Sequence, residues 1–124
     1  MAKARTTGGA ARASFKQSLT GLAARLQSSR RLRRGNVVLR LAGAEAGEYS
    51  LECTEDGVRI NEGPIGSDTP PLLEVFGDSN TIRAIIDGEK DAVRQFYAGG
   101  IRIRGDLRYF SDVAVELGIL KEPL

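Results

Sequence analysis

The residue types that carry most enzyme chemistry are sparse in this chain of 124 residues. It contains no histidine and a single cysteine, Cys53, so the most common general base and metal ligand is missing. A lone thiol without histidine forms neither a zinc site nor an internal disulfide, and we expect Cys53 to be a small buried strand residue. Because no acid–base pair or phosphate-binding loop stands out either, we expect a non-enzymatic protein with no cofactor and no metal.

Positive charge is the second chemically informative feature, and it gathers at the N-terminal end. Residues 1–34 hold nine lysines and arginines and no acid, whereas residues 35–124 hold nine basic residues and all 16 acids. The run SRRLRR at 29–34 suits contact with acidic lipid head groups, CoA phosphates or nucleic acid. The alternative is a solvated helix C-terminus beside an acidic body, where the helix dipole favours cations. The weak candidates for a head-group or phosphate site are Arg30, Arg31, Arg33 and Arg34.

Helical spacing predicts the elements that would position a site. A capping box of Ser14 with Gln17 begins the first helix, and Gly35 with Asn36 is expected to end it. Two short helices are predicted at residues 81–88 and 90–98, and a final helix follows its cap, Asp106. Each helix has apolar residues on one side, so each must pack against something.

Five strands are predicted from alternating apolar and polar residues: 36–43, 47–54, 57–61, 71–78 and 101–104. The Asp56-Gly57 step predicts a tight turn, so the first three strands form an antiparallel meander. In the last strand Ile101 and Ile103 face the core, while Arg102 and Arg104 face solvent or pair with strand carboxylates.

The element order predicts an α+β two-layer sandwich, in which a five-stranded, mainly antiparallel sheet has helices covering one face. At this length the chain forms one domain. We place a flexible basic tail at 1–13, the domain at 14–120 and a short C-terminal tail at 121–124. No apolar run approaches the roughly 18 residues that span a bilayer, and no secretory signal is recognised, so we expect a cytoplasmic protein.

The C-terminal half carries a family resemblance. The stretch LLEVFGDSNTIRAIIDG (72–88) resembles the fourth strand and the following helix of the sterol carrier protein 2 family, and QFYAGGIRIRGDL (95–107) resembles its closing segment with the turn and the fifth strand. The N-terminal half is similar by pattern only. Asp87 differs from the neutral hydroxyl residue that is usual in the family at this position, and the last helix carries Asp112 and Glu116.

The resemblance implies a lipid-binding or lipid-transfer module that holds a fatty acyl, acyl-CoA, sterol or isoprenoid ligand in an apolar tunnel between sheet and helices. The inward side chains are the candidate lipid-binding residues, although the same residues would also fill an ordinary core. They are Tyr49, Leu51, Ile60, Val75, Ile82, Ile86, Val93, Phe96, Tyr97, Phe110, Val113 and Leu117.

Two other functions compete with lipid carriage. A protein-interaction or scaffold module with a filled tunnel could assist a lipid-modifying enzyme. Binding to nucleic acid through the basic arm is the third reading, and we do not expect it. The expected partners are a lipid or fatty-acyl ligand and, through the basic N-terminal segment, an acidic membrane surface; the oligomeric state is left open.

Overall fold

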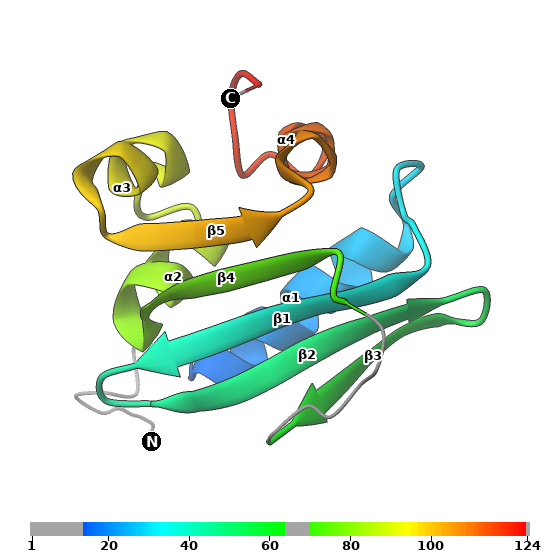
Figure 1. Cartoon of the computed structure of the whole chain (residues 1–124), viewed down its shortest axis with the longest axis horizontal. Helices are drawn as coiled ribbons and strands as arrows, with labels where there is room; N and C mark the ends of the chain where they lie inside the picture. The colour runs from blue at the N-terminus through cyan, green and yellow to red at the C-terminus, as the bar shows by residue number, and fades with distance from the viewer. Residues whose placement is uncertain (1–13, 64–69, 124) are drawn as a thin grey trace, which may run out of the picture.

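The computed structural model describes residues 14–63 and 70–123, which form one five-stranded sheet and four helices (Figure 1). Residues 1–13, predicted as a tail, lie outside the described residues. The elements are α1 (Phe15–Gln27), β1 (Gly35–Ala42), β2 (Gly47–Thr54), β3 (Gly57–Glu62), β4 (Leu73–Asp78), α2 (Ser79–Ile86), α3 (Ala92–Ala98), β5 (Ile101–Gly105) and α4 (Leu107–Glu116).

The sheet has the strand order β3-β2-β1-β4-β5. Strands β1, β2 and β3 form the predicted antiparallel meander, β4 pairs in parallel with β1, and β5 pairs antiparallel with β4. In Figure 1, α1 crosses behind the sheet, and α3 and α4 lie beside β5. The predicted fold class, an α+β sandwich with a mainly antiparallel sheet, is therefore confirmed.

Alternation along the strands sets the inner face of the sheet. Leu39, Val75 and Ile101 lie on neighbouring strands β1, β4 and β5 and are all buried. On the outer face, Arg102 and Arg104 are exposed, and Arg102 lies over the Phe76 ring at 5.2 Å. The side of each residue follows from the two-residue period of a strand.

The first helix begins as predicted and ends earlier than predicted. The Ser14 hydroxyl accepts the N–H of Gln17, whose side chain accepts the N–H of Ser14, so the capping box is present. The helix ends at Gln27 and not at Gly35. Its apolar stripe ends at Leu26 and residues 27–31 are polar, so the next helical turn would have no apolar side chain to bury. The interpretation of 29–34 as a helix C-terminus is therefore wrong.

The joint between β5 and α4 depends on a glycine and an aspartate. Gly105 has a φ of +110°, and an added Cβ would lie 2.4 Å from the Leu72 carbonyl oxygen, so no larger residue fits. Asp106 caps α4 by accepting the Tyr109 N–H at 2.9 Å. The predicted cap, Asp106, is therefore the N-cap of α4.

Acid is expected to destabilise this part of the fold. The Tyr109 N–H, followed by Arg33, lowers the pKa of Asp106 below its ordinary 3.8, and the Ser29 hydroxyl lowers the pKa of Glu116 below its ordinary 4.5. Both carboxylates bind protons more readily in the unfolded chain than in the folded protein. Their contribution to the stability of the fold is therefore present at pH values above those ordinary pKa values. It is lost as the pH falls through the lower folded-state pKa values.

Urea unfolding midpoints measured from pH 6 to pH 2 test this expectation. We expect a steep decline below about pH 4.5, and a shallower decline in Asp106→Asn because that variant has no carboxyl group to protonate there. An identical pH profile in Asp106→Asn would contradict the assignment.

Candidate functional site

An apolar cavity of about 100 Å³ lies between the sheet and the helices. Every side chain around it is apolar, and together they come from four strands, all four helices and the segment after α4. The lining residues are Leu22, Leu26, Val37, Leu39, Leu51, Leu73, Val75, Ile82, Ile85, Ile86, Ala92, Ile101, Phe110, Leu117 and Ile119. A lining of this kind is compatible with a hydrocarbon group and offers no polar side chain for catalysis.

Half of the predicted lipid-binding residues line this cavity. They come from β2, β4, α2, α4 and the residue after α4, and they are Leu51, Val75, Ile82, Ile86, Phe110 and Leu117. Sequence reasoning omitted further lining residues on the same apolar faces, including Leu22 and Leu26 of α1 and Leu39 of β1. Their signal was present in the spacing of α1 and the alternation of β1.

The other six predicted residues lie elsewhere. Tyr49 packs on Phe15 with ring centroids 5.2 Å apart, and Val113 is buried without lining the cavity. Ile60 and Phe96 are half-buried against the core. Val93 lines the neighbouring groove, and Tyr97 is 76 % exposed.

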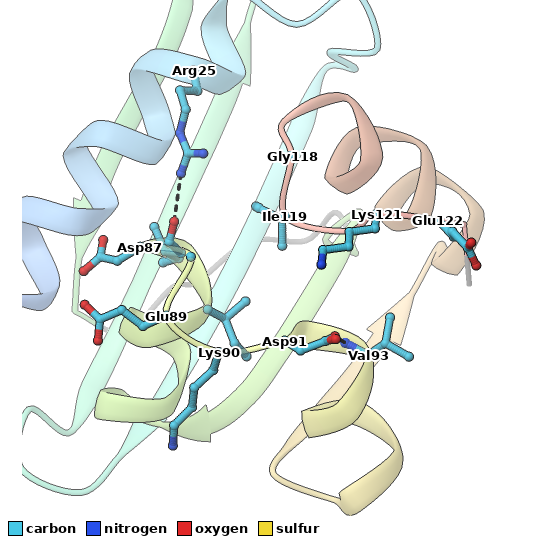
Figure 2. A pocket seen from close by; sticks show the side chains of 13 residues that line it. Arg25, Asp87, Glu89, Lys90, Asp91, Val93, Gly118, Ile119, Lys121 and Glu122 are labelled. Carbon is cyan, nitrogen blue, oxygen red and sulfur yellow. Dashed lines mark hydrogen bonds between the residues drawn. The ribbon is translucent and has the colours of Figure 1, made fainter.

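A larger, charged groove of about 540 Å³ adjoins the cavity (Figure 2). The two spaces share Ile85, Ile86 and Ile119, so they are neighbours on either side of these three side chains. Its other lining residues are Arg25, Asp87, Gly88, Glu89, Lys90, Asp91, Val93, Gly118, Lys121 and Glu122. An apolar space beside a charged groove suits an amphipathic ligand.

Arg25 joins the walls of the two spaces. Its guanidinium donates to the Ile86 carbonyl at 3.1 Å, the dashed line from Arg25 in Figure 2, and to the Leu117 carbonyl at 3.2 Å. It therefore connects the ends of α2 and α4. Both carbonyls belong to helix C-terminal ends, where a cation is favoured. The Leu117 and Ile119 wall is therefore held to α1 by a side chain that reaches the groove.

A buried arginine network supports the α2 side of the groove. Arg83 is only 5 % exposed and donates to Asp87 at 2.9 Å and to Glu89 at 3.2 and 3.3 Å. The bonds with Glu89, more than those with Asp87, raise the pKa of Arg83 above its ordinary value. Asp87 also accepts the Ser18 hydroxyl at 3.0 Å, which ties α2 to α1. The unusual aspartate is thus already paired inside the protein.

The weak head-group candidates at 29–34 lie away from the cavity. Arg31, Arg33 and Arg34 pair with carboxylates of the body, and the Arg30 backbone N–H donates to Glu116. The three ion pairs are Arg31 with Asp112, Arg33 with Asp106 and Arg34 with Glu55. These arginines therefore contact the acidic body, as the alternative interpretation expected, although not from a helix.

The described residues give little support to thiol chemistry or to metal binding. Cys53 is 1 % exposed, and burial raises the pKa of its thiol, which disfavours the reactive thiolate. Over residues 14–63 and 70–123, no group of three or more potential metal ligands is present. Within the same ranges, no helix has the length and apolar character needed to cross a membrane.

No protein-family model and no curated protein sequence matches the chain. Solved structures do match: the chain has the fold of sterol carrier protein 2 domains, and the resemblance seen in the sequence is confirmed at that level.

Three of these structures illustrate the likeness. Sterol carrier protein 2 from Yarrowia lipolytica, in its apo form, has a TM-score of 0.58 and 18% identity, covering 86% of this chain and 84% of its own. Sterol carrier protein 2 from Aedes aegypti, in complex with palmitate, has a TM-score of 0.63 and 14% identity, covering 86% and 96%. The UbiJ-SCP2 ubiquinone synthesis protein has a TM-score of 0.59 and 14% identity, covering 83% and 94%.

Proposed function

We propose that this protein is a non-enzymatic lipid carrier that holds the hydrocarbon chain of a fatty-acyl ligand between the sheet and the helices. The observation that carries the proposal is the wholly apolar cavity that adjoins a charged groove at the surface. The palmitate complex of the Aedes aegypti protein, which has the same fold, supports a fatty-acyl ligand. The binding unit is the domain at 14–120 together with the Lys121–Glu122 side of the groove.

The cavity must enlarge to take such a chain. At about 100 Å³ it is smaller than the roughly 150 Å³ engineered cavity that accepts benzene. The wall best placed to move is the segment of Leu117 and Ile119, because it lies beyond the end of α4 and its side-chain link to α1 consists of the hydrogen bonds of Arg25, which cost little to break. Burial of a C16 chain contributes on the order of 10 kcal/mol, and losing those bonds costs roughly 1 kcal/mol each. The gain is large enough to drive the movement.

Native mass spectrometry of the purified full chain tests the proposal. We expect a one-to-one complex after incubation with palmitate, and an unfolding midpoint that rises with palmitate concentration. At about 100 times the dissociation constant the stabilisation is roughly 2.7 kcal/mol. Absence of both the mass shift and the stabilisation would refute lipid carriage.

A scaffold module for a lipid-modifying enzyme is the second candidate function. The small volume of the cavity favours the scaffold function, because an interior filled by side chains has no room for a hydrocarbon chain. The UbiJ-SCP2 ubiquinone synthesis protein shows that this fold also occurs in a protein named for a biosynthetic process. If the purified protein stays folded but binds no palmitate, hexadecanol or sterol, that result would favour the scaffold function over lipid carriage.

A further inference from the structure

We propose that the charged groove selects a lipid with a single carboxylate head group, anchored by the Lys121 ammonium. The inference rests on the proposed carriage of a fatty-acyl chain and adds the chemistry of its head. It places the carboxylate beside Ile119, where the groove meets the apolar cavity.

The cations of the groove differ in what they already bind. Arg25 uses two of its five N–H donors on the Ile86 and Leu117 carbonyls, so three remain. Among the described residues, the ammonium groups of Lys90 and Lys121 have no hydrogen bond or ion pair. Figure 2 shows the Lys121 ammonium directed toward Ile119 and the interior of the groove, whereas the Lys90 ammonium points away. Lys121 is therefore the cation that is both unpaired and well directed.

Most of the acids in the groove are already engaged. Arg83 pairs with Asp87 and Glu89, and Asp91 accepts the N–H groups of α3 at 2.8 and 3.3 Å. The Glu122 carboxylate points away from Arg25 in Figure 2. None of these acids competes directly for the Lys121 ammonium, which is left to bind the carboxylate of a ligand as a charge-assisted hydrogen bond.

The same acids set an upper limit on the negative charge of the head group. Three cations and four carboxylates line the groove, and the buried Arg83 behind it balances the difference. A single carboxylate can pair with the Lys121 ammonium beside Ile119. The several phosphates of a CoA thioester would extend over Glu89 and Asp91, where like charges repel. The groove therefore favours free fatty acids over acyl-CoA.

The test compares three C16 lipids on three full-length proteins. Palmitate, hexadecanol and palmitoyl-CoA are titrated at pH 8 against wild type, Lys121→Glu and the matched control Lys16→Glu, an exposed lysine of α1 that lines neither the groove nor the cavity. We expect Lys121→Glu to weaken palmitate binding about tenfold or more. Hexadecanol binding to that variant, and palmitate binding to Lys16→Glu, should stay within about twofold of wild type. Palmitoyl-CoA should bind wild type more weakly than palmitate, and the gap should narrow as salt screens the repulsion.

Each contrary result has a distinct meaning. Equal palmitate affinity in Lys121→Glu and wild type overturns the anchor while carriage stands. An equal loss of palmitate affinity in Lys16→Glu, or a parallel loss of hexadecanol affinity in Lys121→Glu, also overturns it, because the loss then comes from the overall charge or from damage to the fold. Palmitoyl-CoA binding as tight as palmitate at low salt overturns the limit on charge. If wild type binds neither palmitate nor hexadecanol, the proposed carriage itself fails.

Discussion

Replacing Val75 with phenylalanine is expected to reduce palmitate affinity by tenfold or more, which corresponds to about 1.4 kcal/mol or more of binding free energy. Val75 lies on β4, next to β1 and β5 in the sheet, lines the cavity and is 9 % exposed. The larger ring would occupy the roughly 100 Å³ where the hydrocarbon chain begins to enter. The ligand would then have to displace a packed aromatic side chain instead of filling a space.

The variant should still fold, because overpacking a core costs roughly 1–3 kcal/mol. Val58→Phe is the matched control, since Val58 packs half-buried on the edge strand β3 and does not line the cavity. Palmitate binding is measured by native mass spectrometry, and folding by circular dichroism. Unchanged palmitate affinity in folded Val75→Phe would show that the chain lies elsewhere. If Val75→Phe does not fold, Ile82→Phe addresses the same cavity from α2.

Local signals predicted most of the fold. The alternation of Ile101 to Arg104 correctly predicted which side of β5 is buried, because successive strand residues point to opposite faces. Capping residues predicted the starts of α1 and α4, since a side-chain acceptor at the first turn is a local interaction. These features depend on neighbours in sequence, so a single sequence contains them.

The candidate site was predicted only in part. Phe96 and Tyr97 are adjacent in α3, and residues one apart on a helix are about 100° apart, so both rarely face one cavity. Phe96 is half-buried and Tyr97 is exposed, with their rings 5.6 Å apart. Which of the two turns inward depends on the packing of α3 against β5, and that is tertiary information.

The buried arginine of α2 was missed, although a signal was present. Arg83 lies among isoleucines in α2, and this position favours the interpretation that it belongs to the polar face of an amphipathic helix. Its spacing of four residues from Asp87 is the spacing of a helical ion pair. What the sequence could not supply is the burial, because it results from α1 packing on α2 and from Glu89 folding back over the helix end.

Removing Asp87 alone is expected to destabilise the protein by about 3 kcal/mol, because a buried guanidinium loses a carboxylate partner. In Asp87→Ala, Arg83 keeps only Glu89, whose side chain is 59% exposed, and the Ser18 hydroxyl loses its acceptor. Nε of Arg83 already has no hydrogen-bond partner among the described residues, so the loss of a further partner leaves the buried guanidinium more poorly hydrogen-bonded. The free energy of unfolding is measured by urea denaturation.

The double variant Arg83→Met/Asp87→Ala separates a buried-charge effect from a loss of packing. It should be less destabilised than Asp87→Ala alone, because methionine fills the space without a charge that needs partners, and the exposed Glu89 is readily hydrated. Asp112→Ala, which removes a surface ion pair with Arg31 at 4.0 Å, should cost less than about 1 kcal/mol. A double variant as unstable as the sum of its single variants would show that the two residues act independently. The network would then not be the reason for the aspartate at position 87.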